Sequence, residues 1–237
     1  MTRDDGNWAK PVKNLEATDR EGAINANVRG RRLNAANGGF GRLFQKTFTV
    51  QVGSHVTPEE VIQVWKTRFG EFWPKGQKMF LSPTGIAPGE VGLINASIPG
   101  TPTMATGILV IYADDISFSF MSPEGHPIAG PLTFSAFTDE SGFTVAQAQE
   151  LTRASDPFWE LAMMMPVLGD RMQNDIWRAT LANLAKHFGA TDATVNTKIV
   201  VVDSRRQWRN AKNIWQNAAI RSGLSAPRRW ARRLAPR

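Results

Sequence analysis

The sequence predicts an α+β fold in which a curved antiparallel β-sheet of about six or seven strands grips a long C-terminal helix. Three observations support this prediction. The middle of the chain alternates short apolar runs with turn signals, the connections between those runs are short, and a long helical pattern follows them. Short connections favour antiparallel pairing, because a parallel pair needs a long crossover.

The first strand and the first helix have clear local signals. Residues 43–52 alternate, and one face of this strand consists of Phe44, Lys46, Phe48, Val50 and Val52. A helix is expected after Thr57, which can cap its first turn, with Pro58 at the first helical position and Glu60 completing a capping box. We expect this helix to end near Gly70.

A long β region comes next. Its candidate strands are residues 77–81, 91–96, 104–112, 116–121, 132–138 and 143–152. Turn signals such as Pro99-Gly100 and Glu124-Gly125 separate them. Residues 91–113 carry no charge and are long enough to span a bilayer, but Pro99, Gly100 and Pro102 would break a lipid-exposed helix. Two strands joined by a turn are therefore expected here.

The C-terminal part is expected to be mainly helical. Asp156 is an expected N-cap, and a longer helix over residues 170–188 follows with an apolar stripe of Trp177, Leu181, Leu184 and Phe188. This stripe must be buried against the concave face of the sheet, and an apolar cavity remains where the two do not meet. A last strand over residues 198–202 and a helix over 205–221, with Trp208, Trp215 and Ala219 on one face, complete the prediction.

Charge and composition divide the chain into four segments. They are a polar N-terminal arm (1–41), the helix-grip domain (42–202), a C-terminal helical extension (203–226) and a basic tail (227–237). The net charge is +7, but residues 203–237 alone carry +9, which leaves −2 for residues 1–202. A nearly neutral domain makes nucleic acid an unexpected partner. The tail makes an anionic membrane surface the alternative partner, through Arg228, Arg229, Arg232 and Arg233.

The same composition makes several other features unexpected. The chain has no cysteine, so disulfides and thiolate metal sites are excluded. The three histidines, His55, His126 and His187, lack zinc-ligand spacing, and we expect neither a metal nor a cofactor. The first residues contain no apolar signal segment. We expect a cytoplasmic protein, with a peripheral position at the inner membrane face as the alternative.

Several short runs resemble a known group. GIAPGEV (85–91), GHP (125–127), RASDP (153–157) and WQNAAIR (215–221) occur in the expected order, together with Trp177 and Leu181. Over residues 39–221 the chain resembles a family of uncharacterised actinobacterial proteins, which looks like an outlying branch of the START-related helix-grip (SRPBCC) ligand-binding superfamily. The resemblance implies a sheet gripping a C-terminal helix, with lipids, sterols, polyketides or other apolar molecules held between them. It implies no catalytic residues.

We therefore expect the chain to bind an apolar small molecule of the lipid, isoprenoid or polyketide class, without catalysis. The candidate ligand-binding residues are Phe118, Phe120, His126, Phe134, Arg153, Trp159, Met163, Met164, Met165 and Trp177. Methionines adapt to irregular ligands, although ordinary core packing explains them and the phenylalanines equally well. One alternative is a cyclase- or hydrolase-like enzyme that uses His126 with Arg153. Another is an adaptor whose basic tail binds an anionic membrane or nucleic acid.

Overall fold

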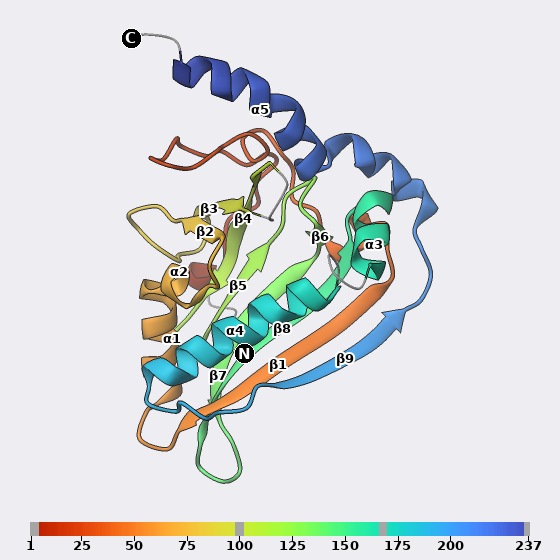
Figure 1. Cartoon of the computed structure of the whole chain (residues 1–237). Coiled ribbons are helices and arrows are strands. Elements are labelled where there is room, and N and C mark those ends of the chain that lie inside the picture. Colours follow the sequence, from red (N-terminus) through yellow and green to blue (C-terminus); the bar gives the residue numbers. More distant parts are fainter. Residues whose placement is uncertain (1–4, 98–101, 166–169, 235–237) are drawn as a thin grey trace.

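The chain folds into one large antiparallel sheet that curves around a long helix, as a computed structural model shows (Figure 1). The structure describes residues 5–97, 102–165 and 170–234. The strands are β1 (Leu43–Gly53), β2 (Gln77–Phe80), β3 (Val91–Ala96), β4 (Met104–Ala113), β5 (Ser117–Met121), β6 (Ile128–Ala129), β7 (Pro131–Thr138), β8 (Thr144–Ala154) and β9 (Asn196–Asp203). The α-helices are α1 (Pro58–Thr67), α2 (Phe69–Phe72), α3 (Pro157–Met164), α4 (Asp170–His187) and α5 (Ala218–Leu234). The 3-10 helices are η1 (Asp5–Asn7), η2 (Ala36–Gly38) and η3 (Trp208–Gln216).

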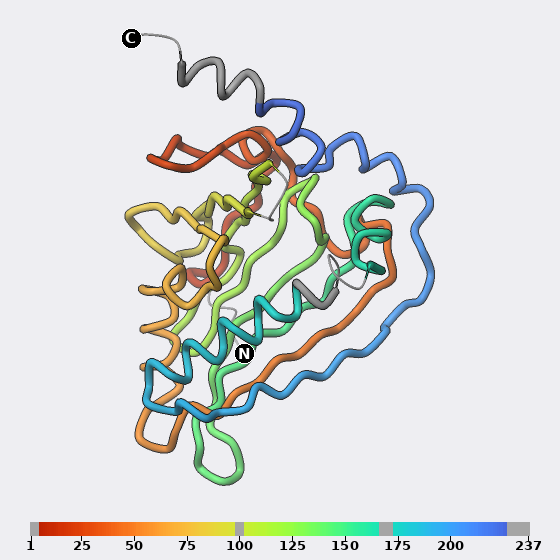
Figure 2. The backbone as a smooth tube through the Cα atoms, in the orientation of Figure 1, coloured from red at the N-terminus to blue at the C-terminus, as the bar shows by residue number. Residues whose placement is uncertain are grey.

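The predicted fold class is confirmed. The strand order is β2-β3-β4-β5-β7-β8-β1-β9, with β6 paired to β8 beside this path. The helix α4 lies across the concave face of the sheet, over β1 and β8, as the backbone trace in Figure 2 shows. The described residues form nine strands, above the six or seven expected in the sheet, because the predicted last strand (β9) pairs with β1 in the same sheet and the two-residue β6 was not predicted.

Local sequence signals explain the first strand and helix. Along β1, the side chains of Lys46, Phe48, Val50 and Val52 are buried, as the alternation predicts. Thr57 accepts a hydrogen bond from the backbone N–H of Glu60, whose carboxylate accepts one from the backbone N–H of Thr57. This capping box starts α1 at the expected place. The helix ends at Thr67, and α2 follows it directly.

Aromatic side chains fill the core between α1, α2 and the sheet. Trp65 and Phe69 are fully buried and contact Phe118 and Phe134, whose rings stack at a centroid distance of 4.8 Å. Aromatic pairs of this kind contribute about 0.5–1.5 kcal/mol each beyond the burial of their surface. The stripe of α4 packs against the same cluster, with Trp177, Leu181 and Leu184 buried.

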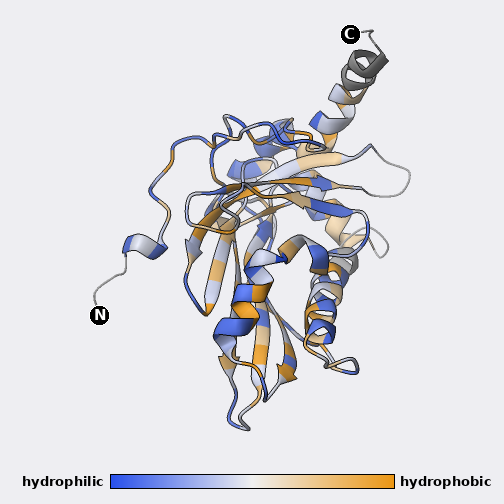
Figure 3. Cartoon of the chain, turned by 90° about the vertical axis from the view of Figure 1, so that its left-hand side faces the viewer, coloured by the Kyte–Doolittle hydropathy of each residue, from blue (hydrophilic) through white to orange (hydrophobic). Residues whose placement is uncertain are grey.

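The N-terminal arm runs along the outside of the sheet (Figure 3). Its apolar side chains form a second, smaller core with β3 and β4. Leu15 and Val28 are buried against Leu93 and Leu109 of β3 and β4. The buried amide of Asn27 donates hydrogen bonds to backbone oxygens of β4 and α5 and to the hydroxyl of Ser222, the last at 3.0 Å. The arm, a central strand and the C-terminal helix therefore meet at one side chain.

The structure corrects the expected helix over residues 205–221. The chain forms the 3-10 helix η3 up to Gln216 and begins α5 at Ala218. The amides of Asn210 and Asn213 each donate to two backbone carbonyls outside the helix. Their three-residue spacing matches the 3-10 period, which keeps both amides on the inner face.

The helix α5 continues into the segment assigned as the basic tail and ends at Leu234. Alanine, arginine and leucine, which dominate this segment, are strong helix formers. Residues 91–113 form β3 and β4 rather than a membrane helix, although 98–101 lie outside the described residues. Across the described ranges, no helix combines the length and the apolar character that a bilayer span requires.

Candidate functional site

A cavity of about 160 Å³ lies between the concave face of the sheet and the helices α3 and α4. Strands β2 to β7 supply one side of its wall, and the two helices supply the other. The apolar part of the wall includes Met79, Ile94, Met104, Ile108, Phe120, Leu132, Trp159, Ala162, Met163, Ile176 and Trp177. These residues come from nearly every element that surrounds the space between the sheet and α3 and α4, so the cavity results from the fold itself.

The wall also contains polar atoms that lack a partner. The hydroxyl groups of Thr106 and Ser122 and the indole N–H of Trp159 are buried and have no hydrogen-bond partner among the described residues. An unpaired buried polar group of this kind costs about 1–3 kcal/mol. Buried polar groups without a partner are rare in native proteins, and one explanation is a bound ligand that supplies the missing hydrogen bonds.

A buried polar cluster lies behind the α4 side of the wall. Glu150 of β8 is fully buried and accepts hydrogen bonds from the side chains of Gln173, at 3.1 Å, and Trp177. The oxygen of the Gln173 amide accepts from the ammonium group of Lys46 at 3.3 Å. Lys46 is the register partner of Glu150 on β1 and is itself buried. The cluster fixes the orientation of Gln173 and Trp177, both of which line the cavity.

His126 is half-buried in the wall, in the turn before β6. Its Nδ1 accepts a hydrogen bond from the backbone N–H of Ile128 at 3.2 Å. Burial, which disfavours the charged imidazolium, lowers the pKa of His126 to about 4. The side chain is therefore neutral at physiological pH.

No protein-family model and no curated protein matches the chain. Solved structures are similar to it at low sequence identity. The protein Ms6760 from Mycobacterium smegmatis is 14% identical over 60% of this chain and 89% of its own, with a TM-score of 0.44. The di-domain ARO/CYC StfQ from the steffimycin biosynthetic pathway is 14% identical over 62% of this chain and 50% of its own, with a TM-score of 0.43. Ara h 8.0201 is 12% identical over 62% of this chain and 99% of its own, with a TM-score of 0.43.

Part of the candidate set lies together in the cavity wall. Phe120, His126, Trp159, Met163 and Trp177 line the same cavity, although they come from four separate parts of the chain. The helix α3 contributes Trp159 and Met163 because Asp156 caps its first turn by accepting from the backbone N–H of Trp159. Contact of these residues with a ligand stays a prediction.

The other candidates lie elsewhere. Phe118 and Phe134 belong to the packed aromatic core. Met164 and Met165 are exposed, at 57% and 44%. Arg153 is buried outside this cavity. It donates hydrogen bonds to Asp203 at 2.6 Å and to the backbone oxygen of Gly41 at 2.7 Å, so it joins β8 to the end of β9 and to the residues just before β1.

Sequence reasoning missed Lys46, Glu150 and Gln173. The sequence contained a signal for Lys46, because this charged residue lies on the face of β1 whose other residues are apolar. A charged residue there requires a buried polar partner from another element. Among the residues that the structure describes, no His, Asp or Glu side chains cluster in the number that a metal ion needs. The site therefore offers an apolar wall, a few hydrogen-bonding groups and a neutral imidazole.

Proposed function

We propose that the chain binds an apolar small molecule of the lipid, isoprenoid or polyketide class in the cavity between the sheet and α3 and α4. The observation that carries this proposal is the cavity itself, which has a mainly apolar wall at the centre of the fold. Concave sites with apolar walls and a few polar groups are typical of small-molecule binding. All the wall residues belong to residues 42–202, which supports the assignment of this segment as the binding domain.

The cavity volume limits the size of the ligand. An engineered apolar cavity of about 150 Å³ accommodates benzene. The 160 Å³ found here therefore suits one or two small rings, or a short length of an acyl or isoprenoid chain. A longer lipid requires part of the wall to move outward.

The polar atoms in the wall narrow the chemistry further. A hydroxyl or carbonyl group on the ligand would meet the bonding needs of Thr106, Ser122 or the indole N–H of Trp159. Because each unmet bond costs about 1–3 kcal/mol, a ligand with one such group should bind more tightly than the corresponding hydrocarbon. Polyketides and isoprenoid alcohols have this combination of an apolar body and an oxygen.

An enzymatic role for His126 is the second candidate, and the geometry does not favour it. A general base works best when its pKa lies near the working pH, whereas burial lowers the pKa of His126 to about 4. Its Nδ1 is already bonded to the backbone of Ile128. Arg153, its expected partner, lies outside the cavity wall. We therefore propose binding without catalysis.

Equilibrium dialysis with two ring compounds tests the proposal. The full chain is dialysed against 2-naphthol and, separately, against naphthalene, which lacks the hydroxyl group. We expect saturable binding of both, with one site per chain, and tighter binding of 2-naphthol. Ala162→Phe, which places a ring at the cavity wall, should remove this binding.

Ala182→Phe is the matched control, because Ala182 lies on the exposed face of α4. It should bind both compounds as the unchanged chain does. Thermal unfolding of both variants establishes that each is folded. If the unchanged chain binds neither compound saturably, or if Ala162→Phe binds as well as Ala182→Phe, the cavity is not the binding site.

A further inference from the structure

One surface of the protein combines exposed aromatic and apolar side chains with basic ones. Trp208 and Trp215 of η3 are 74% and 81% exposed, and Leu224 of α5 is 76% exposed. The outer face of α3, next to η3, adds further exposed apolar groups. We call this the Trp–Arg surface, which comprises Phe158, Leu161, Met164, Met165, Trp208, Arg209, Lys212, Trp215, Arg221 and Leu224.

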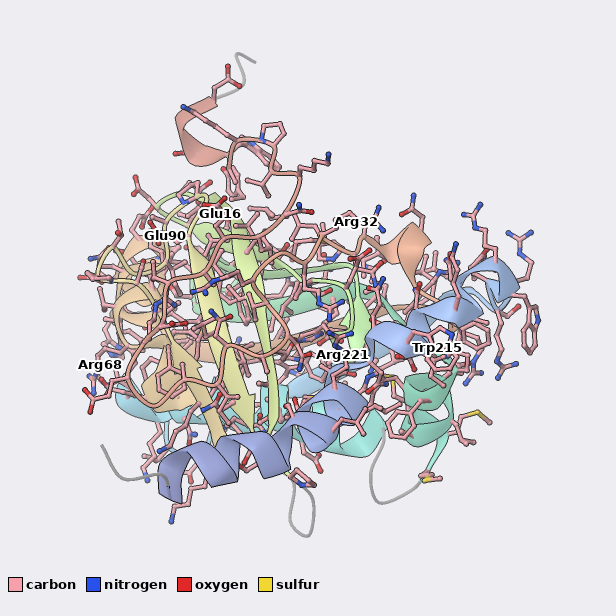
Figure 4. All side chains as sticks on the ribbon, turned by 90° about the horizontal axis from the view of Figure 1, so that it is seen from above. Glu16, Arg32, Arg68, Glu90, Trp215 and Arg221 are labelled. Carbon is pink, nitrogen blue, oxygen red and sulfur yellow. The ribbon has the colours of Figure 1, made fainter. Side chains whose placement is uncertain are left out.

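The fold holds this surface in place. The amides of Asn210 and Asn213 bind η3 to the arm and to Ser155 just before α3. With about three residues per turn, these amides take the inner face, which leaves Trp208 and Trp215 on the outer faces. Figure 4 shows Trp215 at the end of η3 that lies next to α3, and Arg221 further along on α5. The exposure of the two tryptophans therefore follows from the inner asparagines.

The surface carries a clear excess of positive charge. The nearby carboxylates are already engaged, since Asp203 accepts from Arg153 and Arg205, and Glu160 accepts from Arg206. No acidic residue follows Asp203 in the sequence, whereas Arg209, Lys212 and Arg221 are exposed. Residues 203–237 therefore carry a net charge of +9, and Asp203 is their only acidic residue.

We propose that the Trp–Arg surface docks the protein on an anionic phospholipid bilayer. Tryptophan rings suit the headgroup layer because they are apolar with one polar N–H. Lysine and arginine are attracted to anionic headgroups, and surfaces with both features lie in the bilayer interface. Nucleic acid would use the basic residues but would leave Phe158, Leu161 and Met164 in water, so the bilayer is the better match.

The position of α3 connects this surface to the cavity. One face of α3 lines the cavity through Trp159, Ala162 and Met163, whereas Phe158 and Leu161 are exposed on its outer side. A docked protein would therefore have a single helix between the bilayer and the cavity. Docking does not require a ligand in the cavity, so its failure and that of the proposed function are distinguishable.

Vesicle flotation of the full chain tests the docking. The vesicles contain phosphatidylcholine alone or phosphatidylcholine with about one-third phosphatidylserine, at low ionic strength. We expect binding to the anionic vesicles that weakens as salt is added. The double variant Arg209→Gln/Lys212→Gln should weaken it by about 10–30-fold, because each basic residue contributes roughly a factor of five. Trp208→Ala/Trp215→Ala should weaken it to a similar degree.

Two control variants carry equivalent changes on other surfaces. Trp8→Ala removes a 42% exposed tryptophan of the arm, and Lys78→Gln/Lys186→Gln removes two exposed lysines from β2 and α4. Both should bind vesicles as the unchanged chain does. Absence of binding to anionic vesicles, or equal binding by test and control variants, would overturn the proposal. The proposal would also be overturned if duplex DNA bound the protein more tightly than the vesicles do and removed it from them.

Discussion

Asp156 and Asn217 cap two different helices and are hydrogen-bonded to each other, with 2.9 Å between Asn217 Nδ2 and Asp156 Oδ2. The other oxygen of Asp156 accepts from the backbone of α3, and the amide oxygen of Asn217 accepts from two backbone N–H groups in the first turn of α5, those of Ala219 and Ile220. Both side chains are fully buried, and burial raises the pKa of Asp156. The starts of α3 and α5 are therefore stabilised together.

We expect Asn217→Ala to lower the free energy of unfolding by about 1–3 kcal/mol, because it removes a cap and a partner of a buried carboxylate. Asn217→Asp should cost more at pH 7, since it places a second carboxylate beside Asp156. That neighbour raises the pKa of Asp156 further, so the folded state takes up a proton and the loss shrinks as the pH falls. Urea unfolding of both variants at pH 7 and pH 5 measures this. Identical losses at both pH values would contradict it.

Glu150→Gln should lower the free energy of unfolding by about 1–3 kcal/mol, because Glu150 is a buried acceptor for Trp177 and Gln173 and the amide puts a donor in place of one acceptor oxygen. Urea unfolding is again the measurement, and Glu140→Gln, in an exposed turn, is the control. A double-mutant cycle with Trp177→Phe isolates the hydrogen bond to the indole. A coupling energy of zero would mean that this bond contributes nothing to stability.

Trp177→Ala should lower the free energy of unfolding by about 3–5 kcal/mol, the usual cost of removing a buried aromatic ring. Only 7% of Trp177 is exposed, and its ring packs against Phe134. Trp208→Ala removes an exposed ring and should change stability by less than about 0.5 kcal/mol. Chemical denaturation of the two variants compares them directly. A loss below about 1 kcal/mol for Trp177→Ala would show that the stripe of α4 contributes little to the core.

His126 should make the protein less stable in mild acid. Its pKa is about 4 in the folded state and about 6.5 in the unfolded chain, so the unfolded chain binds the extra proton between these values. Stability should therefore fall by up to about 1.4 kcal/mol per pH unit as the pH drops from 6 towards 4.5. His126→Asn cannot take up this proton, and its amide can still accept from Ile128. Unfolding midpoints of the two chains that fall in parallel over this range would refute the assignment.

Elements with local signals were the ones that the sequence predicted well. The capping box at Thr57, the cap at Asp156 and the alternation of β1 depend on residues a few positions apart, and all appear in the structure. The stripe that contains Trp177 and Leu181 was predicted for the same reason, because its spacing alone requires burial. The fold class followed from adding these local signals together.

Elements that depend on distant partners were predicted less well. An α-helical period fits Trp208, Trp215 and Ala219, but Asn210 bonds to residues about 170 positions earlier, and that contact selects the 3-10 geometry. The cluster around Glu150 likewise requires knowing that Lys46 is its register partner and that Gln173 lies above both. Such pairings become visible only once the strands are placed side by side.

The contact between Asn27 and Ser222 has a consequence for protein synthesis. The two residues are 195 positions apart, and Ser222 also accepts the backbone N–H of Ala105. At about 5–20 residues per second, a ribosome takes on the order of 10–40 s to travel from one to the other. During that time Asn27 can bond to Ala105 of β4 but lacks its two partners in α5. Asn27 therefore completes its hydrogen bonds only after Ser222 has been translated, although its bond to β4 can form much earlier.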